Sequence, residues 1–135
     1  MIAETLITVG KELFGVFSKL DENRLKRTVR VADYFSSLAE IIETTSAYLK
    51  KGIYPDGECA ELRFHAEKMV STIGDIIGEA EAEKYEELLL GVWEIERMHG
   101  ELISVSEAER EEKLRILDEA AGYFRGVSAH LRVSS

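Results

Sequence analysis

The feature that most constrains the fold is an uninterrupted amphipathic stretch, Leu25 to Leu49. Its small and apolar residues recur at alternating spacings of three and four, which places them on one stripe of an α-helix. The stripe consists of Leu25, Thr28, Ala32, Phe35, Ala39, Ile42, Ser46 and Leu49. No Pro or Gly interrupts the stretch, which would be roughly 37 Å long at about 1.5 Å per residue. A helix with such a stripe must bury it against partners, and the rest of the chain offers three similar stripes. They are Cys59, Leu62, Ala66, Met69, Ile73 and Ile76; Tyr85, Leu88, Val92, Ile95, His99 and Leu102; and Leu114, Leu117, Ala121, Phe124, Ser128 and Leu131.

The sequence therefore predicts an all-α fold, an antiparallel four-helix bundle with left-handed crossings. Short connections place consecutive helices antiparallel, and we expect one helical domain over residues 1–135. The bundle occupies residues 24–133, and its helices are expected at about 24–51, 58–77, 80–103 and 107–133. An additional amphipathic helix is expected over residues 2–20. It has no assigned place, so it either folds across the bundle or buries its apolar face in another chain.

Local signals mark the expected ends of the helices. Asp21 and Asn23 are good N-cap types, which favours a break between the first two helices. Gly52 is a plausible left-handed residue after the second helix, and Asp56 is the expected N-cap of the third. Gly78 is expected to end the third helix at a sharp corner. Ser106, followed three residues later by Glu109, is a capping-box sequence that opens the last helix.

Composition excludes several classes of function. The 135 residues carry 17 basic and 26 acidic side chains, a net charge of −9, which opposes non-specific binding to DNA or RNA. The single cysteine, Cys59, rules out an intramolecular disulfide. No apolar run approaches the roughly 18 residues of a membrane span, and the first residues do not read as a signal peptide. Cytoplasm is the expected location.

The expected N-terminal helix is the main candidate for a functional surface. Gly10 and Gly15 each weaken it by roughly 1 kcal/mol relative to Ala, so it needs tertiary or quaternary contacts. An apolar face that the four-helix core does not require is an interaction surface by default. The predicted interaction surface is Ile2, Leu6, Val9, Leu13, Val16 and Phe17. Its expected partner is a protein or a second copy of the chain.

A local basic cluster follows this helix, formed by Arg24, Lys26, Arg27 and Arg30. One interpretation is a solvated face paired with neighbouring glutamates, and the other is a docking patch for an acidic partner. A third hypothesis is peripheral membrane attachment through residues 2–30, with these cations touching anionic lipid. The acidic balance of the whole chain disfavours the membrane hypothesis.

The residue patterns that metal binding and nucleophilic catalysis require are incomplete in this sequence. Di-iron bundles use two Glu-x-x-His motifs, and this chain has one, Glu96 to His99. His99 falls on the apolar stripe of its helix, so a hydrogen-bonded core histidine is favoured over a metal ligand. Cys59 falls near a helix N-terminus, where its pKa could be lowered, but it also occupies a core position. We therefore predict no metal, no cofactor and no catalytic residue, and keep a metal-binding bundle using Glu96 and His99 as the alternative.

Five short strings stand out along the chain: 30–35 (RVADYF), 59–62 (CAEL), 72–78 (TIGDIIG), 94–97 (EIER) and 120–125 (AAGYFR). Together they resemble a group of small all-α bacterial domains of uncharacterised function, loosely connected with signalling or defence proteins. The resemblance covers about residues 24 to 132 and implies an adaptor-like helical module, without implying any site residue. Taken with the surplus apolar face, it favours a non-enzymatic interaction or oligomerisation module.

Overall fold

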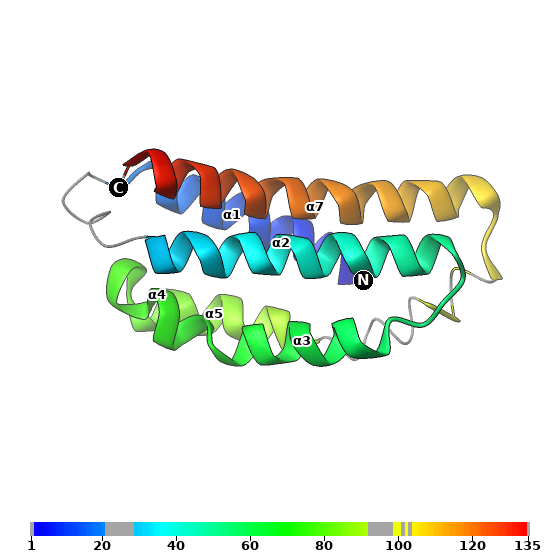
Figure 1. Ribbon diagram of the computed structural model, residues 1–135, viewed down its shortest axis with the longest axis horizontal. Coiled ribbons are helices and arrows are strands. Elements are labelled where there is room, and N and C mark those ends of the chain that lie inside the picture. Colours follow the sequence, from blue (N-terminus) through cyan, green and yellow to red (C-terminus); the bar gives the residue numbers. More distant parts are fainter. Residues whose placement is uncertain (1, 21–28, 92–98, 101, 103, 135) are drawn as a thin grey trace.

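The computed structural model of the chain describes residues 2–20, 29–91, 99–100, 102 and 104–134 (Figure 1). Within these ranges every regular element is a helix, which confirms the predicted all-α class. The helices are α1 (Ile2–Ser18), α2 (Val29–Lys50), α3 (Asp56–Glu67), α4 (Met69–Ile77), α5 (Glu79–Leu89) and α7 (Glu107–Ser134).

Several predicted helix ends are confirmed. Gly52, just after α2, has φ +74°, and Gly78, between α4 and α5, has φ +99°, so both take a backbone conformation that favours glycine. The Ser106 hydroxyl accepts the Glu109 N–H at 3.2 Å, the capping contact expected before α7. Asp56 is not an N-cap, because α3 begins at Asp56 itself and Pro55 takes the cap position.

The predicted helix 58–77 is wrong in one respect: it is two helices, α3 and α4, separated by a turn at Lys68. In an uninterrupted helix the Ala66 carbonyl would accept the Val70 N–H. Here that N–H donates instead to Glu86 Oε1 of α5 at 3.2 Å. Two tertiary bonds hold the break, because the Tyr34 hydroxyl of α2 also donates to the His65 carbonyl at 2.5 Å.

The predicted helix 80–103 is interrupted, since α5 ends at Leu89 and a turn follows at Leu90. His99, Gly100 and Leu102, near its predicted end, are helical. Its buried side chains include Tyr85 and Leu102 of the predicted stripe but differ from that stripe at Leu88. Ala82, Tyr85 and Leu89 are buried, whereas Leu88, which was expected in the core, remains 38% exposed. Val92 and Ile95 of the predicted stripe lie outside the described residues.

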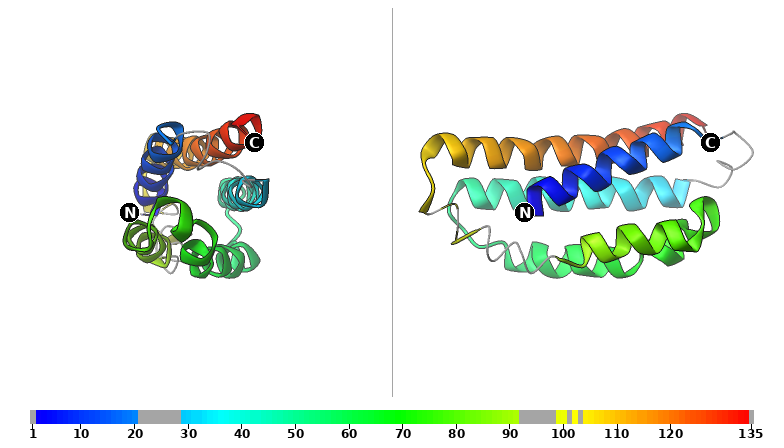
Figure 2. Two further views of the ribbon diagram at one scale, coloured as in Figure 1. Left: turned by 90° about the vertical axis from the view of Figure 1, so that its left-hand side faces the viewer. Right: turned by 180° about the vertical axis from the view of Figure 1, so that it is seen from behind.

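The helices form two layers, with α1, α2 and α7 above α3, α4 and α5 in Figure 1. Viewed end-on in Figure 2, they surround a common centre. α7 packs extensively against both α1 and α2, α2 also contacts α3, and α5 contacts α1 and α3. α1 therefore packs against its own molecule and lies beside α7, and the two helices run in the same direction.

A line of ion pairs fixes the antiparallel seam between α2 and α7. Exposed pairs of this kind each contribute at most about 1 kcal/mol, so they set register more than stability. Inside the seam the buried Ser128 hydroxyl donates to the Ala32 carbonyl at 2.8 Å, which satisfies a polar group in the core. The pairs are Lys50–Asp118, Glu43–Arg125 and Asp33–Arg132.

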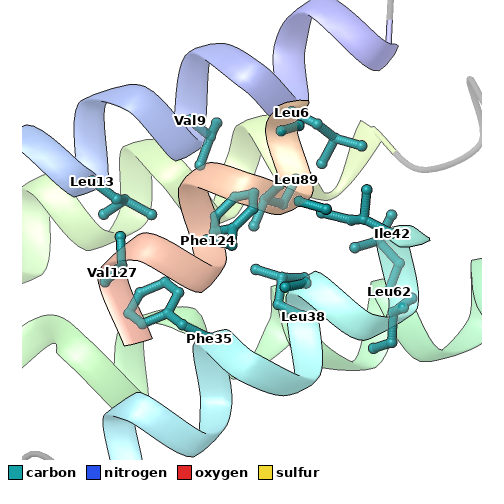
Figure 3. Close-up of a cluster of buried hydrophobic side chains, with 14 of the residues drawn as sticks. Leu6, Val9, Leu13, Phe35, Leu38, Ile42, Leu62, Leu89, Phe124 and Val127 are labelled. Atoms are coloured by element: carbon teal, nitrogen blue, oxygen red, sulfur yellow. The ribbon is translucent and has the colours of Figure 1, made fainter. Parts of the chain in front are cut away.

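One hydrophobic cluster connects all the layers, as Figure 3 shows for residues of five helices. Every residue of the predicted α7 stripe is buried: Leu114, Leu117, Ala121, Phe124, Ser128 and Leu131. The described part of the α2 stripe, Ala32 to Leu49, is buried as well. α2 also buries Val31, Leu38, Ile41 and Thr45, because it packs between α7 and α3 rather than against one neighbour.

Candidate interaction surface

The predicted interaction surface on the N-terminal helix is wrong as a surface. Leu6, Val9, Leu13 and Phe17 are each 0–1% exposed, and Figure 3 shows the first three packed into the molecule's own core. Val16 is half-buried, and the side chain of Ile2 lies outside the described residues. This apolar face is therefore covered by α7 and its neighbours, and cannot bind a partner while the chain is folded.

The physical reason is close packing of α1 on α7 at two glycines. A Cβ at Gly10 would lie 3.0 Å from Tyr123 Cβ and 3.4 Å from the Ala120 carbonyl oxygen. A Cβ at Gly126 would lie 2.9 Å from the Phe14 ring. The glycine that weakens α1 as an isolated helix thus lets the helix approach α7, where packing supplies the stability.

The predicted basic docking patch is described only at one residue. Arg30 is exposed near the start of α2, whereas Arg24, Lys26 and Arg27 lie outside the described residues. The membrane hypothesis loses its apolar surface, because the described core-facing side chains of α1 are buried. In the described ranges no helix combines the length and apolar character needed to cross a bilayer.

The predicted metal pair cannot be assembled from the described residues, because Glu96 lies outside them. His99 is half-buried; its Nε2 lies 3.3 Å from the Gly52 carbonyl oxygen and its ring meets Tyr54 edge-on. The Cys59 thiol contacts the Tyr54 hydroxyl at 3.8 Å. Among the residues that are placed, no group of three His, Cys, Asp or Glu side chains could hold a metal ion.

Among the described titratable groups, Tyr34 has the most strongly shifted pKa. It lies between α2 and the α3–α4 corner, with its ring stacked on His65 and its hydroxyl 3.9 Å from Met69 Sδ. Burial, and secondarily the charge of Glu86, raise the pKa of Tyr34 well above its ordinary value. Because its hydroxyl is committed to the His65 carbonyl, this shift reflects a structural role.

A polar groove of about 520 Å³ lies on the surface between α2 and α3. Ser37, Glu40, Ile41, Thr44, Glu58, Glu61 and His65 line it. His65 Nδ1 lies 3.0 Å from the Glu61 carbonyl oxygen, so that ring nitrogen interacts within its own helix. The groove presents hydrogen-bond acceptors and negative charge to solvent.

A second concave surface lies on the outside of α1 and α7, which we call the α1–α7 hollow. Its lining residues are Phe14, Glu119, Gly122 and Tyr123, around a volume of about 420 Å³. The Phe14 ring stands edge-on to Tyr123 at 6.2 Å and remains 39% exposed. Lys11 places its ammonium 5.7 Å from the centre of the Tyr123 ring. Two aromatic rings beside an exposed glycine make this an apolar surface with charge at its rim.

Phe14 is not among the six residues of the predicted interaction surface, although it is an apolar residue of the same helix. Phe14 follows Leu13 by one residue, which turns its side chain by about 100° around the helix axis. It therefore points away from the buried face of Leu13 and Phe17 and toward the outside of α7. The signal that could have identified the hollow is the pair Gly122 and Gly126, four residues apart on α7.

No family model, curated protein or solved structure matches this chain. The resemblance to small all-α bacterial domains therefore stays a prediction.

Proposed function

We propose that this chain is a non-enzymatic helical association module, which binds protein through the α1–α7 hollow. The observation that carries the proposal is the exposure of Phe14 beside Tyr123 and Gly122, around an apolar concavity. Aromatic side chains of this kind are enriched at the centres of protein interfaces, where they fill pockets and exclude water. The proposal keeps the predicted role of the first helix but moves it from the buried face to the outer one.

The proposal also covers the arrangement of the helices as a bundle and the cellular location of the protein. In this arrangement four helical segments form an antiparallel bundle: α2, α3 together with α4, the segment that begins with α5, and α7. α1 is then a fifth helix, which packs against α5 and α7. The contacts of α7 with α2 and of α5 with α3 support this arrangement. A location in the cytoplasm belongs to the same proposal.

No described geometry favours the alternatives of a metal-dependent bundle or a membrane anchor. The imidazole of His99 faces the Gly52 carbonyl and the Tyr54 ring, which are the surroundings of a packed histidine. Leu6, Val9, Leu13 and Phe17, the apolar face that a membrane anchor would insert, are inside the core.

Site-specific photo-crosslinking tests the proposed function. A photoreactive phenylalanine analogue replaces Phe14, and the matched control carries it at Ala47, an exposed position on α2. In cells that express the chain, we expect covalent adducts at position 14 and none at position 47. Peptide mass spectrometry then identifies the crosslinked protein. An absence of adducts at position 14, in a correctly folded chain, would overturn the proposal.

A further inference from the structure

The two layers of helices contact each other less than the helices within the upper layer do. In the upper layer, which is α1, α2 and α7, α7 packs extensively against both of the other helices. α7 has at most slight contact with the helices of the lower layer, α3, α4 and α5. The contacts that cross between the layers, chiefly α2 on α3 and α1 on α5, are much smaller. Because local stability follows local contact density, we expect the fold to separate first at this boundary.

The upper layer has buried contacts of its own. The Phe35 ring of α2 meets the Phe17 ring of α1 edge-on at 5.6 Å and stacks on the Phe124 ring of α7 at 6.1 Å. All three rings are fully buried, so one aromatic group joins the three helices. The hydrogen bond from Ser128 to the Ala32 carbonyl and the ion pairs between α2 and α7 also lie within this layer. These contacts remain when the lower layer moves away.

The boundary between the layers is partly polar and open to water. The Tyr34 hydroxyl of α2 donates to the His65 carbonyl at the end of α3 and lies 3.9 Å from Met69 Sδ of α4. Lys84 of α5 lies 4.0 Å from Glu12 of α1, and both side chains are nearly half exposed. The polar groove of about 520 Å³ lies between α2 and α3, on this same boundary. Exposed polar contacts of this kind contribute little to stability.

The lower layer has an internal bond and a hinge. The Val70 N–H of α4 donates to Glu86 Oε1 of α5, which ties these two helices together. Residues 51–55 connect α2 to α3 and belong to neither helix. Gly52 has φ +74°, and Ile53 is 49% exposed. A hinge is a few residues between elements that absorb the change in backbone angles, and this connection has that position. Rotation there carries α3 away from α2 without breaking helical hydrogen bonds.

On these grounds we infer that α3, α4 and α5 form a lid, which opens as one unit while α1, α2 and α7 stay folded. Tyr34 is the latch between the lid and the upper layer, because its hydroxyl donates to the α3–α4 corner. Opening uncovers apolar side chains of α2, among them Leu38 and Ile42, which share a cluster with Leu62 of the lid (Figure 3). The inference is independent of the proposed function, since the α1–α7 hollow lies wholly in the upper layer.

Hydrogen exchange of the full chain, followed at single amides by NMR, tests the inference. In the wild type, the helical amides of α3, α4 and α5 should exchange with one common protection, about tenfold or more below that in the middle of α2 and α7. The lid amides then report opening of the lid, and the amides of α2 and α7 report global unfolding. Equal protection in both layers would overturn the inference.

Two variants separate lid opening from global unfolding. Val127→Ala removes buried methyl groups of α7, so it should speed exchange in α2 and α7 by about tenfold and leave the lid amides unchanged. Tyr34→Phe removes the latch, which is broken in both the open and the unfolded states, so it should speed exchange in both layers by about fivefold. An equal acceleration of lid and upper-layer amides by Val127→Ala would show that the chain opens only as a whole, and the inference would be wrong.

Discussion

The close contact between α1 and α7 predicts opposite effects for two alanine substitutions in the same helix. Gly10 and Gly15 are both within α1, so each change to alanine gains the same helix propensity, about 1 kcal/mol. They differ in what the new Cβ meets. At Gly15 it meets nothing within 4 Å, whereas at Gly10 it lies 3.0 Å from Tyr123 Cβ and 3.5 Å from Phe124 Cε2.

The expected magnitudes follow from these distances. Gly15→Ala should raise the free energy of unfolding by about 0.5–1 kcal/mol, since only propensity and chain entropy change. At Gly10 the nearest atom is a Cβ, which moves only if its backbone moves, so overpacking should cost about 1–3 kcal/mol. After the propensity gain is subtracted, Gly10→Ala should lower the free energy of unfolding by about 0–2 kcal/mol. The two variants should therefore differ by about 1–3 kcal/mol.

Urea unfolding monitored by circular dichroism measures this difference, at protein concentrations low enough that association does not contribute. Equal slopes for the three proteins would show that the midpoints report stability alone. Equal stabilisation of both variants would refute the reasoning, because it would mean that α1 is not held closely against α7.

Three further predictions concern the α3–α4 corner and the start of α7. Tyr34→Phe should lower the free energy of unfolding by about 1 kcal/mol in urea melts, because it removes the hydroxyl that donates to the His65 carbonyl. Burial, then Glu86, raise the pKa of Tyr34 in the folded state, so the stabilisation is complete below about pH 10 and is lost as pH rises above that value. Melts from pH 8 to 11 should show a shallower alkaline loss in Tyr34→Phe than in the wild type. Ser106→Ala should cost about 1 kcal/mol and speed hydrogen exchange at the Glu109 amide, which loses its cap; an unchanged exchange rate would contradict this role.

The sequence predicted best the helices whose apolar period is strong and complete. All six stripe residues of α7 are buried, and the start of α7 follows the capping sequence at Ser106. The turn at Lys68 could not be predicted in the same way, because no Gly or Pro marks it and the apolar period continues across it. Its cause is tertiary, since Tyr34 and Glu86 supply hydrogen bonds from two other helices.

The candidate site was harder to predict for a related reason. Periodicity shows that Leu6, Leu13 and Phe17 share an apolar face, but it does not show which surface covers that face. The answer depended on Gly10 meeting α7 at Tyr123, a contact between residues more than a hundred positions apart. Phe14, one residue from Leu13, became the exposed aromatic only because Gly126 lies beneath its ring.

The pairing of the first helix with the last has a consequence for synthesis of the chain. At the usual 5–20 residues per second, the ribosome needs roughly 5 to 20 s to proceed from the end of α1 to the start of α7. During that interval the nascent α1 lacks α7, against which it packs most extensively, and its apolar face of Leu6, Leu13 and Phe17 is open to chaperones or to neighbouring nascent chains. Long sequence separation also slows folding compared with helical proteins built from local contacts. The contacts that α7 makes with α1 and α2 can therefore form only after α7 has been synthesised.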